Sequence, residues 1–180
     1  MSRRAAAFAI AAASVLAPAL LPGPAAGQGT AVLEGTFAMS GTVTVAHNVR
    51  GEYAGEQVSR SWTFTQPCPS APCATIQLVR SRPTGTDTLV LTEQPDGSYA
   101  GAGSFYLPLR CARRIYLHGE RVGFTITAAV TGTIAVGGVP LAQAISATYT
   151  NRARRNLTPC VTVLGHDAAT YSGLLQPPAD

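Results

Sequence analysis

Apolar and polar residues alternate along most of the chain that follows residue 30. Between Val122 and Ile134 the even positions are mainly apolar, and the odd positions are mainly threonine, alanine or glycine. A period of two residues is typical of a β-strand with one face on a core and the other in solvent. Similar alternation, weaker in places, occurs at 37–45, 58–64, 76–78, 89–91, 99–107, 141–149, 161–163 and 171–175.

Turn-forming residues separate these segments. Gln94-Pro95-Asp96-Gly97 predicts a tight hairpin turn, and Gly137-Gly138 predicts another between two of the longest strands. No segment after residue 27 shows the 3.6-residue period of a capped helix. The pattern therefore predicts an all-β domain of about eight to ten antiparallel strands.

Two architectures satisfy one apolar face per strand. An antiparallel up-and-down barrel, or a barrel-like meander, closes the sheet on itself, whereas a two-sheet β-sandwich stacks two open sheets. Consecutive hairpins and strands of about ten residues favour the barrel, which also leaves no exposed sheet edge. The sandwich is the alternative.

The first 27 residues have the pattern of an export signal. Arg3 and Arg4 precede an apolar stretch at 5–21, Pro22-Gly23-Pro24 ends it, and Ala25-Ala26-Gly27 fits a cleavage site. We expect a cleavable signal peptide over residues 1–27, a single domain over 28–180 and a secreted or extracytoplasmic location. No transmembrane segment is expected in the mature chain. Loss of Arg3 and Arg4 lowers the formal charge from +4 to +2.

All four cysteines lie in the expected mature chain. An even number of cysteines in an exported chain predicts disulfides. We favour Cys68–Cys73, a short loop stiffened by prolines, together with Cys111–Cys160, which closes a loop of about 50 residues. The other pairings stay open at this stage, and the spacing is unlike that of a zinc site.

Composition and motifs contain no pattern typical of an active site. Only 12% of the residues are charged, and all 13 basic residues are arginine. The serine in Gly97-Ser98-Tyr99-Ala100-Gly101 is misplaced for a nucleophile elbow, and His166-Asp167 would point to opposite faces of a strand. The sequence therefore predicts a protein that is not an enzyme, with no cofactor and no metal.

Five residues are candidates for lining a ligand site inside a barrel. They share the inward parity of their strands, and Arg60 could hold an acidic headgroup at the mouth. The alternative is that large and small side chains interdigitate to fill an ordinary core. The candidates are Arg60, Trp62, Phe64, Phe124 and Tyr149.

Arginines cluster in two segments that a Cys111–Cys160 bond would bring together. Such a patch could bind a polyanion, an acidic lipid or a cell-wall phosphate. Nucleic acid is not expected as a partner, because only Tyr106 and Tyr116 lie near for base stacking. The alternative is a lysine-poor, GC-rich bacterial source that uses arginine for every surface cation. The candidate anion patch comprises Arg110, Arg113, Arg114, Arg152, Arg154 and Arg155.

Several short motifs resemble a pattern found in one group of proteins. The order Trp62-Thr63-Phe64, Cys68 to Cys73 and Tyr99-Ala100-Gly101 resembles uncharacterised secreted β-domains of actinobacteria with a Trp-x-Phe, Cys…Cys and Tyr-x-Gly pattern. Tyr171-Ser172-Gly173 would be the later Tyr-x-Gly. The resemblance implies a secreted β-domain but no activity and no site residue.

Two functions follow as hypotheses. The first is an exported, non-catalytic binding domain for a small apolar ligand or a cell-envelope component. The alternative is a secreted protein–protein interaction module, of inhibitor or adhesion type, that presents the Cys68–Cys73 loop. Pro69 and Pro72 would pre-organise that loop and lower the entropy cost of binding.

Overall fold

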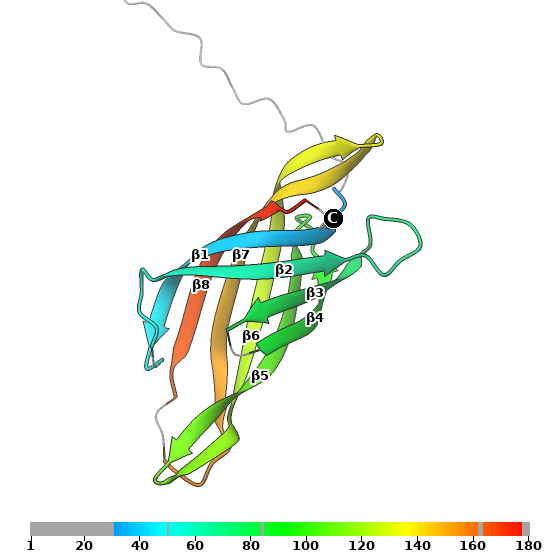
Figure 1. Ribbon diagram of the computed structural model, residues 1–180. Helices are drawn as coiled ribbons and strands as arrows, with labels where there is room; N and C mark the ends of the chain where they lie inside the picture. Colours follow the sequence, from blue (N-terminus) through cyan, green and yellow to red (C-terminus); the bar gives the residue numbers. More distant parts are fainter. Residues whose placement is uncertain (1–30, 50, 84, 162–163, 178–180) are drawn as a thin grey trace, which may run out of the picture.

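The computed structural model describes residues 31–49, 51–83, 85–161 and 164–177, and the expected signal peptide lies outside this part (Figure 1). The described chain is built from β-strands and contains no helix. The strands are β1 (Gly35–His47), β2 (Gln57–Thr65), β3 (Thr75–Arg82), β4 (Gly85–Glu93), β5 (Tyr99–Cys111), β6 (Arg114–Val136), β7 (Val139–Asn156) and β8 (His166–Leu175).

The strands form a closed up-and-down barrel. Each strand pairs antiparallel with the next along the chain, and β8 returns to pair with β1 from Phe37↔Leu175 to His47↔His166. The predicted barrel is therefore confirmed and the sandwich is not formed.

In the described residues we find no helix with the length and apolarity needed to cross a membrane.

The contacts between neighbouring strands differ greatly in length around the ring. The pairing of β4 with β5 is limited to Thr92↔Ala100 and Glu93↔Tyr99, whereas β6 and β7 pair over most of their length. The β6–β7 hairpin extends beyond the barrel at one end and the β5–β6 hairpin at the other (Figure 1).

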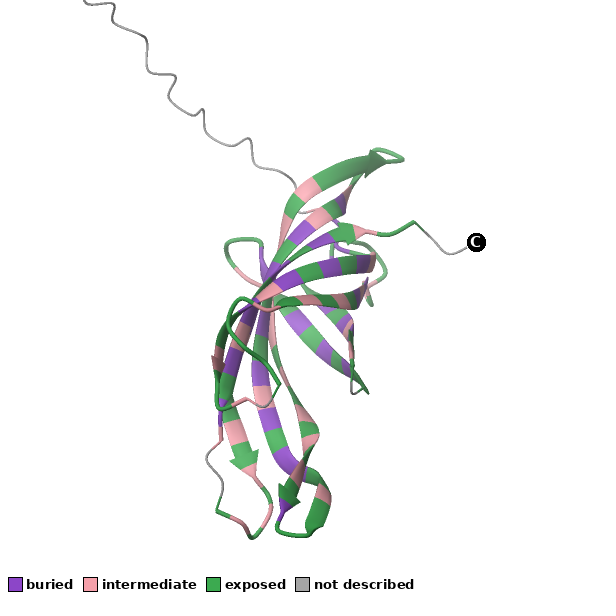
Figure 2. Ribbon diagram, turned by 60° about the vertical axis from the view of Figure 1, so that its left-hand side comes forward, coloured by how far each residue is buried: buried purple, intermediate pink, exposed green. Residues whose placement is uncertain are grey.

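The predicted alternation is present in the ring and produces the core. Along β6, Val122, Phe124 and Ile126 are buried, whereas Thr125 and Thr127 are exposed. Figure 2 shows the same banding of buried and exposed residues on the other strands. Past Val130 the pairing with β7 becomes irregular and Ile134 is exposed, because this part of the hairpin lies beyond the core.

One end of the barrel is filled by a packed apolar core. Trp62, Phe37 and Phe64 are fully buried, and the rings of Phe37 and Phe64 meet edge to face with centroids 5.6 Å apart. The segment before β1 covers this end, because Val32 bridges to Leu141 and Leu33 is fully buried. This end of the barrel is therefore closed by packed side chains.

Both predicted disulfides are confirmed. Cys68–Cys73 closes the β2–β3 loop at the packed end, and Cys111–Cys160 joins the β5–β6 hairpin to the segment that follows β7. Two disulfides with no free cysteine are typical of an oxidising, extracytoplasmic compartment.

Both predicted hairpin turns occur, but one predicted strand does not. Gly97 adopts a φ of +79° and its N–H donates to the Gln94 carbonyl at 2.9 Å, while Gly137 and Gly138 join β6 to β7. The segment 161–163 was expected to be a strand. Val161 is instead fully exposed in the β7–β8 connection, where no strand pairs with it, and Val163 lies outside the described residues.

Candidate functional site

The end of the barrel opposite the packed core contains a cavity of about 850 Å³. Its walls come from residues on β1 to β3 and on β5 to β8, and its rim includes the β1–β2 loop. Apolar and aromatic side chains form part of the lining, among them Val58, Phe105, Leu107, Tyr149 and Tyr171. The remaining lining is strongly charged.

A buried ion cluster occupies one wall of this cavity. The Arg80 guanidinium donates to Asp87 Oδ2 from Nη2 at 2.7 Å and from Nε at 3.1 Å. Arg82 donates to both carboxylate oxygens of Asp87, at 2.7 and 2.9 Å. The cluster forms because Arg80 and Asp87 are directly paired across the β3–β4 hairpin with both side chains turned inward.

Aromatic rings support the two guanidinium groups of this cluster. The Arg80 guanidinium carbon lies 4.1 Å from the centre of the Phe124 ring and 4.9 Å from that of Tyr149. The Arg82 guanidinium carbon lies 3.9 Å from the centre of the Phe105 ring. Cation–π contacts at these distances hold flat, weakly hydrated cations in place without removing their charge.

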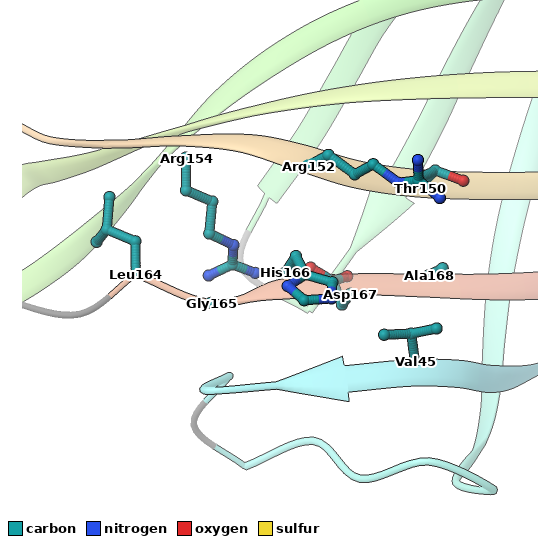
Figure 3. A pocket seen from close by; sticks show the side chains of 9 residues that line it. All are labelled: Val45, Thr150, Arg152, Arg154, Leu164, Gly165, His166, Asp167 and Ala168. Atoms are coloured by element: carbon teal, nitrogen blue, oxygen red, sulfur yellow. Dashed lines mark hydrogen bonds and ion pairs between the residues drawn. The ribbon is translucent and has the colours of Figure 1, made fainter.

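A second ion cluster lies on β6, β7 and β8. Arg154 bridges Glu120 Oε1 at 3.2 Å and Asp167 Oδ1 at 2.7 Å, and Asn151 donates to the same Asp167 oxygen at 2.6 Å. Figure 3 shows Arg154 reaching from β7 to β8, where Asp167 lies. The pairing of β7 with β8 ends at Asn151↔Asp167, and the Arg154 side chain bridges the gap between these two strands beyond that point.

The second cluster borders a smaller hollow on the outer side of the same gap. This hollow measures about 520 Å³ and is bordered by residues of β1, β7 and β8 (Figure 3). It shares Arg154, Leu164, Gly165, Asp167 and Ala168 with the main cavity. The Arg154–Asp167 ion pair therefore forms part of both linings.

Burial keeps the cavity tyrosines neutral. It raises the pKa of Tyr149 well above the usual value for a phenol, and the nearby Asp167 carboxylate adds to the increase. Burial also raises the pKa of Tyr171, although Arg60 and Arg80 oppose the increase. Both hydroxyls therefore stay protonated at physiological pH and can donate or accept hydrogen bonds.

Glu52, on the rim, is expected to make stability depend on pH. Loss of water around its carboxylate, followed by repulsion from Asp167, raises the pKa of Glu52 above its ordinary value of 4.5. The folded protein thus holds this proton more tightly than the unfolded chain does. The contribution of Glu52 to stability is therefore full below pH 4.5 and is lost as the pH rises through the raised pKa.

We expect Glu52→Gln to become stabilising relative to wild type as the pH rises from acidic to neutral. Urea unfolding of both proteins across this range measures the change, and Glu34→Gln controls for the loss of an exposed glutamate elsewhere. A wild-type to Glu52→Gln difference that is constant with pH would contradict the raised pKa.

All five candidate ligand residues lie on inward-facing positions, but not all border the cavity. Arg60 and Tyr149 line it. Phe124 is buried beneath the Arg80 guanidinium, and Trp62 and Phe64 lie within the packed core. The alternation of apolar residues thus identified side chains that face the barrel interior, but only some of these side chains border the cavity.

The candidate anion patch divides in the same way. Arg110, Arg113, Arg114, Arg152 and Arg155 are exposed near the mouth. Arg154 instead turns inside, because β7 carries one extra residue between Thr150 and Ala153 relative to β6. This bulge reverses the parity and places Arg154 opposite the buried Val122.

Sequence reasoning missed most of the ion-cluster residues. For some of them a signal was present. Arg80 and Arg82 continue the inward parity of Ile76 and Leu78, and Asp87 precedes Leu89 and Leu91 on the same parity. The missed residues are Arg80, Arg82, Asp87, Glu120, Asn151 and Asp167.

The remaining candidates lie outside the cavity wall. His47 stacks on His166, whose neighbour Asp167 points inward as strand alternation requires. The described residues include no group of three or more His, Cys, Asp or Glu side chains arranged to hold a metal ion. The Cys68–Cys73 loop is exposed at residues 69–72 at the packed end, and its role as a presented loop stays a prediction.

No family model matches this chain, and searches of curated proteins and of solved structures find no similar protein. The arguments about function therefore depend on the geometry of the cavity and on the chemistry of its surroundings.

Proposed function

We propose that this protein is a secreted, non-catalytic binding protein whose barrel holds a small molecule with an apolar or aromatic body and an anionic group. The observation that carries the proposal is the cavity at one end of the barrel, with Arg60 on its wall. The cysteine pairs and the predicted signal peptide support a location outside the cytoplasm.

The size and shape of the cavity fit a small ligand. Small-molecule sites usually measure about 300–1,000 Å³ and combine apolar walls with a few polar groups. The cavity falls in this range at about 850 Å³. The packed core closes the inner end of the cavity. A ligand would therefore enter from the rim and rest its apolar part against Phe105, Tyr149 and Tyr171.

Arg60 is the group we expect to select an anion. Arg60 lies on the inward parity of β2 and is half-buried. Its guanidinium donates a hydrogen bond to the Ser59 carbonyl at 2.8 Å. Among the described residues no carboxylate forms an ion pair with Arg60. Glu52 interacts with Arg60 through its charge but forms no close ion pair with it. A half-buried guanidinium without a close ion pair can bind carboxylates, sulfonates and phosphates through charge-assisted hydrogen bonds.

A binding role also agrees with the state of the buried carboxylates. Asp87, Glu120 and Asp167 each accept hydrogen bonds from arginine, so their charge is already compensated inside the wall. Acid–base chemistry by any of these three carboxylates would require breaking its pair with arginine. We therefore assign the carboxylates to holding the arginines in place.

We expect Arg60→Met to weaken binding of 8-anilinonaphthalene-1-sulfonate by at least about tenfold, because one charge-assisted contact with the sulfonate contributes about 1.5–3 kcal/mol. Fluorescence titration measures the affinity, and native mass spectrometry of protein from an exporting host identifies any co-purified compound. Arg155→Met, which removes an exposed arginine, serves as the matched control. Equal affinities of wild type and Arg60→Met would overturn the assignment of Arg60.

A further inference from the structure

The β5–β6 hairpin and the end of β7 present aliphatic side chains to solvent. Ile115 and Leu117, on β6, are 62% and 75% exposed, and Leu157 and Val161, after β7, are also exposed. These residues lie at the end of the barrel that contains the cavity mouth, where the hairpin extends beyond the ring (Figure 1). We refer to the surface formed by residues 109–117 and 152–161 as the hairpin surface.

Within the two segments that form this surface, the exposed charges all have one sign. In the segments 104–123 and 151–161 the single acidic residue is Glu120, which is buried and paired with Arg154. The exposed arginines of these segments are Arg110, Arg113, Arg114, Arg121, Arg152 and Arg155. The surface is therefore both apolar and cationic.

The structure holds the two segments of this surface together. The Cys111–Cys160 disulfide joins them with a Cα–Cα distance of 5.7 Å, and Leu157 N–H donates to the Gly119 carbonyl at 2.8 Å. Arg110 and Ile115 are direct partners across the β5–β6 hairpin. The arginines and the aliphatic side chains are thus displayed together before any partner binds.

We propose that the hairpin surface docks onto a membrane that contains anionic lipids. Ile115, Leu117 and their neighbours would enter the boundary between headgroups and acyl chains, while the arginines contact lipid phosphates. Interfacial binding of this kind combines buried apolar area with electrostatic attraction, and both are present here. A soluble polyanion would need the arginines alone and would leave Ile115 and Leu117 in water.

Docking in this orientation would turn the cavity mouth toward the bilayer, because Arg110 and Leu109 belong both to the hairpin and to the cavity lining. The proposal does not depend on the identity of a cavity ligand. Membrane docking and ligand binding can therefore succeed or fail separately.

Vesicle co-sedimentation tests the proposal with protein purified from an exporting host. We expect binding to vesicles of equimolar phosphatidylcholine and phosphatidylglycerol, no binding to pure phosphatidylcholine, and loss of binding near 1 M salt, where the Debye length is about 3 Å. Arg113→Gln with Arg114→Gln should weaken binding about 30-fold, at about fivefold for each arginine. Ile115→Ser with Leu117→Ser should weaken it at least tenfold.

The opposite end of the barrel supplies a matched control. The tip of the β6–β7 hairpin exposes Ile134, Val136 and Val139 but carries no charge, so Ile134→Ser with Val136→Ser should bind vesicles like wild type. All variants have the same N-terminal residues, so any difference in vesicle binding between them comes from the substituted hairpin residues. A Leu117→Trp variant should show blue-shifted emission on anionic vesicles, because the new side chain would leave water for the membrane interface. The native Trp62 is fully buried, so its emission should not change on docking.

Three results would overturn the proposal. The first is equal binding to neutral and anionic vesicles, or binding to neither. The second is loss of binding in the Ile134 and Val136 variant equal to that in the Ile115 and Leu117 variant. The third is binding to heparin and to anionic vesicles that the Ile115 and Leu117 substitutions leave unchanged, which would identify a site for soluble polyanions.

Discussion

Asp87→Asn is expected to lower the free energy of unfolding by about 3–5 kcal/mol, because removing one partner of a buried ion pair leaves the other charge uncompensated. Asp87 contacts both Arg80 and Arg82, and Arg80 is only 5% exposed. Phe124 and Tyr149 contact the Arg80 guanidinium but cannot replace a carboxylate. Urea unfolding monitored by the emission of Trp62 measures the loss.

A double substitution separates the loss of the pair from the burial of a lone charge. Arg80→Leu with Asp87→Leu places apolar side chains at both positions, and such replacements are often close to neutral for stability. We expect the double variant to be more stable than Asp87→Asn. If Asp87→Asn itself falls within about 1 kcal/mol of wild type, as an exposed pair would, the cluster does not behave as a buried one.

Removing the Cys111–Cys160 disulfide is expected to cost about 4 kcal/mol, because the bond closes a loop of about 50 residues in the unfolded chain. Cys111→Ala with Cys160→Ala is the variant, and its midpoint of urea unfolding is compared with that of wild type under oxidising conditions. The effect should be large because this bond joins the β5–β6 hairpin to the segment after β7 at the mouth of the barrel.

The second disulfide provides the comparison. Cys68 and Cys73 are five residues apart, so the entropy model gives about 2 kcal/mol for removing that bond. We expect Cys68→Ala with Cys73→Ala to be the milder change, although Cys73 is also buried in the core. A greater loss of stability in this variant would show that local packing, and not loop length, determines the contribution of each disulfide.

The barrel could be predicted because local rules agree along the chain. Alternation on β6 predicts a strand with one buried face, and the Gln94–Gly97 and Gly137–Gly138 turns each specify antiparallel neighbours in sequence order. A meander needs no other information about strand order. The two disulfides were predictable for a similar reason. The short loop favours Cys68–Cys73, and Cys111 and Cys160 are then the remaining pair.

The charged interior could be predicted only in part. Arg80 and Asp87 occupy inward parity, but a charged residue at the end of a short strand is usually exposed, and this general preference hid their position. Arg154 could not be found in this way, because the extra residue on β7 changes parity within an otherwise regular segment. Neither glycine nor proline marks this bulge on β7, so composition does not reveal it.

The single long-range pairing in the ring determines the order in which the barrel can be completed. Every pairing except that of β1 with β8 joins strands adjacent in the chain, and the two strands that close the ring are the first and the last. Because synthesis proceeds from the N-terminus, one edge of β1 stays without its partner until residues 166–175 have been made. A chain stopped before that point would keep an open strand edge, which is a template for pairing with other chains. An intact C-terminal strand is therefore needed to cover the open edge of β1 before it can pair with another chain.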